Sequence, residues 1–391
     1  MTYSKHRRTS WVLAAVFSTS LGVGLIFGFE PPLIAMVLNR AGNSTVAIGG
    51  VIAVSLVAIL ILGPAYPGLI ARIGLQRSVV GGVAFSIIVL LIMPFWSGVA
   101  PWLLLRMLTG FALGLAWIAS EVWMNRAIPD GARGTVMGIY GTVFAIGTVA
   151  GPGLLEFTGT VGAWPFIAGG LCLALTLLPL ALLPQVAASS AEHGAAHTQS
   201  LRDLPRLLWL APAVMAAALI AGLVESAELS LLPLYGVREA LSERSALLLL
   251  TIFLAGNVIL QLPIGLLADR FGRRLMLGIC ALMSGIGPLL LPQCLHQPWL
   301  LGPLLFVWGG TLYAFYSQGV ALLGEVFEAR DVAGANTLFV MIYCSGGVLG
   351  PSVGGLMMDL WPHDGLPALL SAAAFCLLAG LVLGRQRRVA Q

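Results

Sequence analysis

Long apolar segments dominate this chain and constrain its fold more than any other feature. A helix needs about 20 consecutive apolar residues to cross a bilayer, and about twelve such segments follow one another, separated by Pro, Gly and charged clusters. They lie at roughly 11–38, 45–68, 78–97, 100–125, 134–158, 161–184, 207–234, 243–268, 273–293, 297–325, 332–359 and 364–384. They lack the strict alternation of a membrane β-barrel. The sequence therefore predicts an all-α membrane protein with about twelve transmembrane helices.

The composition excludes most other classes of protein. Only 9% of the residues are charged, against about 25% in a typical soluble domain, and 59% are hydrophobic. Lys5 is the only lysine, so the chain has no P-loop of its own and cannot power transport with a Walker ATPase. The few charges form no basic face for nucleic acid, and the cysteines include no C-x-x-C pair. We expect no enzyme activity, no cofactor and no metal site.

The distribution of Lys and Arg predicts the orientation in the membrane. With both termini inside, the predicted outer loops hold only Arg40, Arg238 and Arg244. The inner segments hold Lys5, Arg7, Arg8, Arg72, Arg77, Arg126, Arg133, Arg202, Arg206, Arg270, Arg273, Arg274, Arg330, Arg385, Arg387 and Arg388. We therefore expect an integral plasma membrane protein with both termini in the cytoplasm, as in a bacterial inner membrane.

Two motifs occur once in each half of the chain. RIGLQR (72–77) follows the second apolar segment and DRFGRR (269–274) follows the eighth. Gly151-Pro152 lies in the fifth segment and Gly350-Pro351 in the eleventh. This repeat predicts two pseudo-symmetric six-helix bundles, 1–184 and 207–391, joined by a cytoplasmic linker at 185–206. Parallel repeats of this kind place a substrate site between the halves, near the bilayer midplane.

Several of these motifs resemble the major facilitator superfamily over essentially the whole chain. GLLADRFGRR (265–274) matches its signature between helices 8 and 9, and RMLTGFALG (106–114) is similar to its helix 4 pattern. SEVWMNRAIPDGARGTVMGIYGT (120–142) resembles its YcaD-like branch. One position departs from the signature, because Ala71 stands where the first copy of the loop usually has Asp. The resemblance implies the major facilitator fold.

The residues of the second loop signature are candidates for gating. Asp269 is expected at the inner end of helix 8, just before a turn at Gly272. Its carboxylate can hold Arg273 or Arg274, or face a helix N-terminus in the other half. A contact that exists in one conformation and breaks in the other would act as a latch, with Arg270 as a further member. The alternative is that the arginines only anchor the loop inside.

Glycine and proline in the fifth and eleventh segments are also gating candidates. Small residues four apart allow close helix approach, and Pro removes one backbone hydrogen bond. Gly151, Pro152, Gly350 and Pro351 therefore predict thin, bendable helices, or simply tight packing. In the superfamily that the chain resembles, G-x-x-x-G-P in helix 5 is associated with exporters, which favours export over uptake.

Charged residues inside membrane segments are costly and usually functional. Glu30 lies in the first segment, Arg106 in the fourth, and Glu225 and Glu228 in the seventh. The resemblance implies that helices 1, 4, 7 and 10 line the central cavity. Two carboxylates three residues apart disfavour double ionisation, so one of them would exchange a proton near neutral pH. We expect these four residues to couple transport to protons; the alternative is a static ion pair between helices.

Polar and aromatic residues of the central segments are candidates for the substrate cavity. They are Glu30, Trp117, Glu121, Asn257, Gln261, Tyr313, Tyr316 and Gln318. Aromatic side chains facing a cavity would suit a cationic or amphipathic ligand through cation–π contacts. The alternative is that they only pack between helices.

The sequence thus predicts a monomeric secondary transporter that moves a small molecule by alternating access in the lipid bilayer. We expect proton-coupled export of a cationic or amphipathic compound, because buried carboxylates outnumber buried basic residues. One alternative is a proton-coupled uptake symporter for a small nutrient. Another is a membrane sensor or scaffold that transports nothing.

Overall fold

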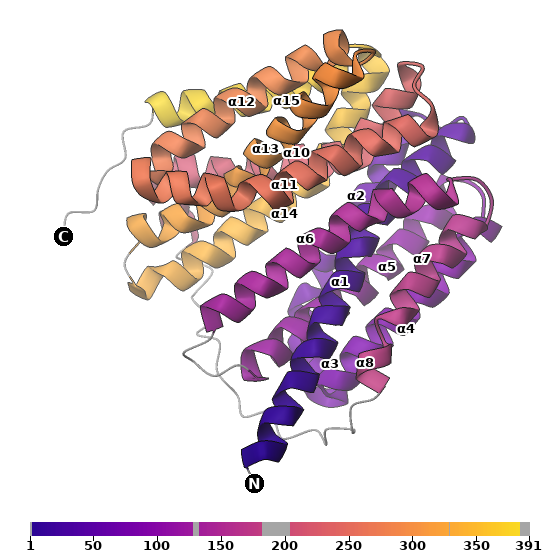
Figure 1. Cartoon of the computed structure of the whole chain (residues 1–391), viewed down its shortest axis with the longest axis vertical. Coiled ribbons are helices and arrows are strands. Elements are labelled where there is room, and N and C mark those ends of the chain that lie inside the picture. Colours follow the sequence, from indigo (N-terminus) through magenta and orange to yellow (C-terminus); the bar gives the residue numbers. More distant parts are fainter. Residues whose placement is uncertain (1, 128–132, 182–203, 328, 384–391) are drawn as a thin grey trace. The chain divides into compact units, whose positions relative to one another are not determined.

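The computed structural model describes residues 2–127, 133–181, 204–327 and 329–383, and within these ranges the regular structure is entirely helical (Figure 1). Among these residues, 11 helices are long and apolar enough to cross a membrane, and a shorter apolar helical stretch lies at Trp164–Leu180. The prediction of an all-α membrane protein is therefore confirmed. The predicted linker lies outside the described residues from 185 to 203.

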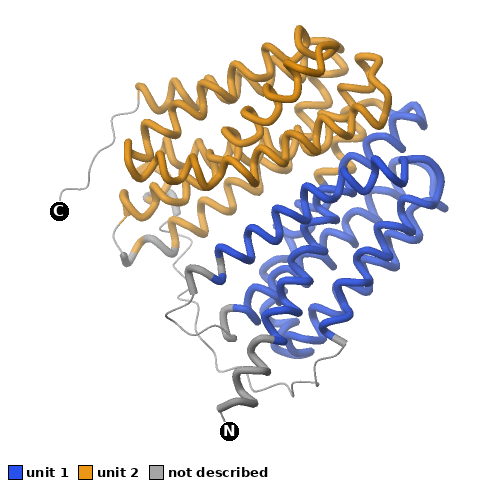
Figure 2. Tube along the Cα trace, viewed as in Figure 1, with its two compact units in different colours: residues 1–43, 54–194 blue, residues 44–53, 195–391 orange. Residues whose placement is uncertain are grey.

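The chain divides into two compact units, residues 1–43 with 54–194 and residues 44–53 with 195–391 (Figure 2). Unit 1 contains α1 (Thr2–Arg40), η1 (Gly63–Ala65), α3 (Tyr66–Ile73), α4 (Leu75–Ile92), η2 (Met93–Phe95), α5 (Val99–Ala127), α6 (Arg133–Thr158), α7 (Trp164–Leu175) and α8 (Leu178–Ala181). Unit 2 contains α9 (Leu204–Leu210), α10 (Pro212–Arg238), α11 (Glu243–Phe271), α12 (Arg273–Cys294), α13 (Pro298–Val326), α14 (Ala329–Leu360) and α15 (Gly365–Leu383). Helix α2 (Thr45–Leu62) begins in unit 2 and continues in unit 1 from Val54.

In unit 1, α1 and α6 lie side by side because glycines line their contact (Figure 1). A Cβ atom at Gly147 would lie 2.3 Å from the carbonyl oxygen of Leu21, and one at Gly151 would lie 2.5 Å from the carbonyl carbon of Gly28. No larger residue fits at either position without moving a backbone. The G-x-x-x-G-P pattern of the fifth predicted segment is thus used for close helix packing.

In unit 2, α10 and α14 pack in the same way. A Cβ atom at Gly346 would lie 2.0 Å from the carbonyl oxygen of Leu219, and one at Gly350 would lie 2.1 Å from that of Leu223. On the other helix, a Cβ atom at Gly222 would lie 1.9 Å from the carbonyl oxygen of Tyr343. Each of the two units therefore contains a glycine-lined helix contact at an equivalent place in the repeat.

Two predicted segments are interrupted rather than continuous. The second passes from α2 through η1 into α3, where Pro64 and Pro67 occupy first-turn positions and lack the amide that a continuous helix would use. The sixth breaks between α7 and α8, where the Thr176 hydroxyl donates to the Leu173 carbonyl oxygen at 2.7 Å. Such a side-chain bond competes with the helical backbone ladder.

Residues 44–53 join unit 2 because the start of α2 approaches α14 closely. A Cβ atom at Gly355 would lie 2.3 Å from the carbonyl oxygen of Thr45, and one at Gly49 would lie 2.1 Å from that of Pro351. The division of the predicted bundles at 184 and 207 stays a prediction.

Candidate functional site

A buried ion pair joins two of the predicted coupling residues in unit 1. Glu30 on α1 and Arg106 on α5 are both almost fully buried, and the Arg106 Nη1 donates to Glu30 Oε2. The Arg106 Nη2 also donates to the hydroxyl of Ser55 on α2, at 2.7 Å. Three helices of the unit thus meet at one guanidinium. The charges are mutually compensated, which is what allows both to be buried.

Aromatic rings surround the second acidic side chain of unit 1. The Trp117 indole N–H donates to Glu121 Oε1 at 2.9 Å. The same indole stacks on Phe144 of α6, with ring centroids 5.9 Å apart, and meets the edge of Phe27 of α1 at 5.8 Å. The predicted cavity residues Trp117 and Glu121 therefore form one cluster, in which the carboxylate is half-buried.

Unit 2 brings a carboxylate together with tyrosines from two other helices. Glu225 on α10 accepts a hydrogen bond from the hydroxyl of Tyr343 on α14 at 2.7 Å, and a second from the hydroxyl of Tyr313 on α13. Tyr316 of α13 packs edge to face on Tyr343, with ring centroids 4.9 Å apart. All four of these side chains are only half-buried. We call Glu225, Tyr313, Tyr316 and Tyr343 the tyrosine cluster.

Glu228 lies one helical turn from Glu225 but has a different environment. Its side chain is fully buried, and neither carboxylate oxygen has a hydrogen-bond partner within the part of the chain that the structure describes. A buried carboxylate without a partner costs several kcal/mol as an anion and much less as a neutral acid. Glu228 thus differs from Glu30, whose charge is compensated by Arg106.

The loop signature residues gather at the junction of α11 and α12. Gly272 has a φ of 96°, which only glycine adopts without strain, and it turns the chain directly from α11 into α12. Arg273 Nη2 lies 3.2 Å from Asp269 Oδ1, and its Nε lies 3.3 Å from Glu325 Oε1 on α13. Arg270 places its guanidinium 5.4 Å from the ring centroid of Phe271. Of the two arginines that the sequence offered to Asp269, the structure pairs it with Arg273.

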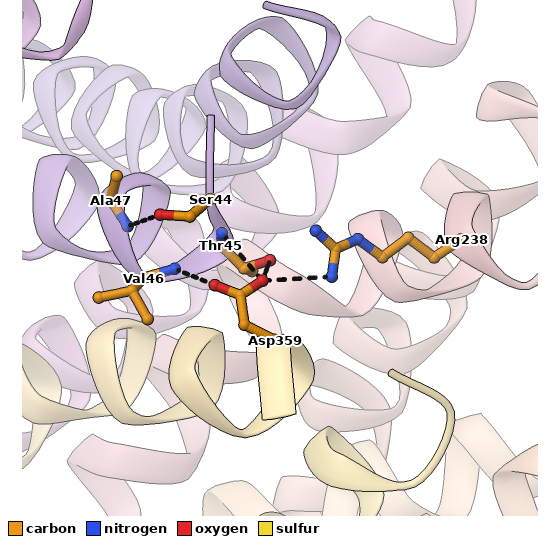
Figure 3. Close-up of polar contacts among 6 residues, drawn as sticks. All are labelled: Ser44, Thr45, Val46, Ala47, Arg238 and Asp359. Carbon is orange, nitrogen blue, oxygen red and sulfur yellow. Dashed lines mark hydrogen bonds and ion pairs between the residues drawn. The ribbon is translucent and has the colours of Figure 1, made fainter. Parts of the chain in front are cut away.

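At the opposite end of unit 2, one carboxylate caps the start of α2 (Figure 3). Asp359 Oδ1 accepts from the hydroxyl of Thr45 at 2.6 Å and from its backbone amide at 3.2 Å, and Oδ2 accepts from the amide of Val46 at 3.1 Å. The Nη1 atom of Arg238, the last residue of α10, lies 3.6 Å from Oδ1. The Ser44 hydroxyl accepts from the amide of Ala47 at 3.3 Å. Three helices therefore converge on Asp359.

The position of Asp359 on its own helix explains why it needs these partners. An acidic side chain in the last turn of a helix faces the negative end of the helix dipole, which is unfavourable. The first turn of α2 presents the positive end of its dipole, together with amides that lack intrahelical partners. Arg238 adds a full positive charge. Asp359 is therefore stabilised by α2 and α10 rather than by α14.

Comparison with known proteins identifies the family. The family model described as Major Facilitator Superfamily matches residues 12–249 and 237–390 of this chain. The chain belongs to the major facilitator superfamily. It is therefore an integral membrane transporter and not an enzyme, and the predicted resemblance is confirmed.

The relatives and the solved structures agree with this assignment. The chain is 23% identical over 372 residues to the MFS-type transporter YfkF of Bacillus subtilis, with 93% of each chain covered. It is 26% identical over 295 residues to the MFS-type transporter YcaD of Escherichia coli, covering 75% of this chain and 73% of that one. The nucleoside transporter NupG superposes with a TM-score of 0.78 at 14% identity, covering 96% and 100%. The D-xylose-proton symporter superposes with a TM-score of 0.76 at 16% identity, covering 97% of this chain and 100% of that one. At these identities the structures establish only the fold.

Within this major facilitator, the predicted site residues fall into separate groups. Glu30 pairs with Arg106, Trp117 with Glu121, and Glu225 with two tyrosines. Asn257 and Gln318 are buried, and the Asn257 side-chain oxygen has no hydrogen-bond partner among the described residues. Gln261, one turn further along α11, is exposed.

Sequence reasoning missed three functional candidates of this major facilitator. Tyr343 lies in the eleventh segment, and it is the only polar aromatic residue of α14 (Ala329–Leu360). Ser55 gives no signal in sequence, because a serine in an apolar helix is common. The position of Asp359 in the sequence does indicate that it needs a partner. An acid at the end of an apolar segment, where the helix dipole disfavours it, requires a partner.

Proposed function

We propose that this major facilitator exports organic cations or cationic amphipathic compounds in exchange for protons, with Glu225 and Glu228 as the protonatable pair. It works as a monomer in a bacterial inner membrane, with both termini in the cytoplasm, as the distribution of Lys and Arg supports. The single observation that carries the proposal is the fully buried carboxyl of Glu228, which has no hydrogen-bond partner among the described residues and lies one turn from Glu225.

Proton coupling needs an acid that is stable in both protonation states at different stages of the cycle. Glu228 without a partner is stable as the neutral acid. When it loses its proton, the nearby charge at Glu225 makes the pair unfavourable, so the two residues share one proton. The groups that face this pair are the hydroxyls of Tyr343 from α14 and Tyr313 from α13. Both can donate to Glu225 and thereby favour its charged form.

The tyrosine cluster supplies the chemistry for a cationic substrate. The face of an aromatic ring attracts a cation, and the attraction grows when the site excludes water. Glu225 adds a full negative charge beside the rings of Tyr316 and Tyr343. In such a site, a proton and a cation compete for the same pair of carboxylates, Glu225 and Glu228. Competition of this kind is the basis of exchange, because binding of either one releases the other.

A flux assay in liposomes tests both the coupling and its direction. Purified protein is reconstituted with a pH-sensitive dye inside, equal pH on both sides, and valinomycin with potassium to hold the membrane potential at zero. Ethidium is added outside, and sugar, amino acid and organic acid are added in parallel samples. Exchange predicts that the lumen becomes alkaline on adding the cation. Acidification of the lumen with any solute would instead indicate uptake by symport.

Two variants make the assay specific for the proposed residues. Glu228→Gln removes the exchangeable proton and preserves the size of the side chain, so we expect the proton signal to disappear. Glu156→Gln on α6 is the matched control, because Glu156 is a half-buried acid outside the proposed pair. Equal proton flux in the wild type and Glu228→Gln would refute the coupling role. If no solute changes the pH of the lumen, the result would favour a sensor or scaffold.

A further inference from the structure

An open groove of about 1240 Å³ runs along α12, where this helix packs against α13 and α15. Its walls at the far end are the apolar side chains of Ile279, Leu282 and Leu378. Ile279 and Leu282, both on this membrane-spanning helix, are 44% and 42% exposed. The groove belongs entirely to unit 2 and is separate from the tyrosine cluster.

The other end of the groove is charged. Arg273 and Arg274 line it together with Glu325. The Arg274 Nη2 donates to the carbonyl oxygen of Leu381 at 2.5 Å, which holds this guanidinium across the last turns of α15. Arg273 is held by Asp269 and Glu325. Arg273 therefore meets two carboxylates, whereas Arg274 is held by a backbone carbonyl oxygen, so the positive charge at this end of the groove comes from Arg274.

The first turn of α12 adds to the positive potential at this end. Gly272 is the residue that precedes the helix, and as a glycine it has no side chain with which to cap the first amides. The first hydrogen bond of the helix runs from the amide of Met276 to the carbonyl oxygen of Gly272 at 3.1 Å. Amides that precede it in the first turn point away from the helix and favour an anion. A phosphate group that lay here would therefore meet both amides and guanidiniums.

A glycine opens the floor of the groove between its two ends. A Cβ atom at Gly278 would meet only the Cδ1 of Leu378, at 3.9 Å. The glycine is therefore not required by helix packing, in contrast to Gly346 or Gly222. It leaves a channel that runs from the arginines toward Leu282. The rise from Arg273 to Leu282 is about 14 Å at 1.5 Å per residue, close to the depth of one leaflet, which is about 15 Å.

We propose that this groove binds one anionic glycerophospholipid. Its phosphate lies against Arg273, Arg274 and the start of α12, and an acyl chain lies over Gly278 toward Leu282. The charge at one end, the apolar walls and the length of one leaflet together match this class of ligand. A basic pocket between transmembrane helices at the membrane surface selects anionic over neutral headgroups. A bound lipid of this kind would tie α12, α13 and α15 together beside the Asp269–Arg273 pair.

Native mass spectrometry of the full chain tests the proposal. The protein is delipidated in detergent and mixed with equal amounts of phosphatidylglycerol, phosphatidylethanolamine and phosphatidylcholine of identical acyl chains. We expect one phosphatidylglycerol adduct to predominate, with a preference of about fivefold for each arginine that contacts the phosphate. If the wild-type protein retains the three lipids equally, or prefers phosphatidylethanolamine, the proposal is wrong.

Three variants locate the lipid. Gly278→Leu fills the channel and should abolish the selective adduct. Gly81→Leu on α4 is its control, because it places the same side chain on a membrane-spanning helix where nothing lies within 4 Å of a Cβ atom among the described residues. Arg274→Gln should reduce the preference about fivefold. Size-exclusion chromatography confirms that each variant is folded. If Gly278→Leu and Gly81→Leu retain the lipid equally, the lipid does not occupy this groove.

Discussion

The carboxylate of Asp359, in the last turn of α14, caps α2 by accepting hydrogen bonds from both the hydroxyl and the backbone amide of Thr45. A carboxylate that serves another helix in this way is stabilised only while the two helices stay together. Asp359 and Thr45 therefore hold the start of α2 against the end of α14, at the end of unit 2 opposite to Asp269.

Asp359→Asn should weaken this contact measurably. The amide removes the charge that pairs with Arg238 and leaves one acceptor oxygen instead of two, so we expect a loss of about 1 to 2 kcal/mol in the free energy of unfolding. Denaturant titration in mixed micelles measures it. Asp364→Asn, an exposed acid in the next loop, should have no effect. In a double-mutant cycle with Thr45→Val, additive losses would show that the two residues do not interact.

The ion pair of Glu30 and Arg106 should behave as a structural pair. Arg106→Gln leaves Glu30 buried without its counter-charge, and removing one partner of a buried pair costs about 3 to 5 kcal/mol. The double variant Glu30→Gln with Arg106→Gln leaves no charge and should recover most of that stability. If the double variant is stable but has lost proton flux in liposomes, the pair belongs to the coupling machinery as well.

Tyr316→Leu should weaken binding of a quaternary ammonium ion, which cannot donate hydrogen bonds and therefore reports on the rings alone. Loss of one cation–π contact should raise the dissociation constant for tetraethylammonium about tenfold, as measured by isothermal titration calorimetry. Tyr316→Phe retains the ring and should bind as the wild type does. An unchanged affinity in Tyr316→Leu would exclude this ring from the cation site.

Substitution by alanine at two glycines of α6 should change the free energy of unfolding in opposite directions. At Gly147 the new Cβ would lie 2.3 Å from a backbone oxygen, and overpacking of this kind costs about 1 to 3 kcal/mol. At Gly153 nothing lies within 4 Å of a Cβ atom among the described residues, so Gly153→Ala should stabilise the helix by about 0.5 to 1 kcal/mol. Thermal unfolding of the two variants in the same detergent compares them. A similar loss of thermal stability in both variants would show that close packing at Gly147 does not explain its effect.

The helices could be predicted from sequence because the bilayer imposes both their length and their composition. The close approach of α10 and α14 was also predictable, since Gly346 and Gly350 are four residues apart and leave room for a backbone. The interruption after Leu175 was not predicted. It depends on a side-chain hydrogen bond of Thr176 that apolarity does not encode.

The partners of the charged residues were the part that sequence could not supply. Glu30 and Glu228 are both acids on apolar helices, yet Glu30 pairs with Arg106 and Glu228 has no partner in the described part of the chain. The difference depends on the rotation of each helix relative to its neighbours. Asn257 and Gln261 show the same limit: they share a helix face, but one is buried and the other exposed, because burial depends on which helix covers that face.

The glycines that line the α1–α6 and α10–α14 contacts also have a genetic consequence. Every missense change of a glycine codon adds at least a Cβ atom, and at Gly222 or Gly346 that atom would meet a backbone oxygen at 2.0 Å or less. At these codons the genetic code offers no conservative replacement. Random mutagenesis under selection for a folded transporter should therefore recover only synonymous changes there, whereas Gly278 and Gly81 should accept many residues.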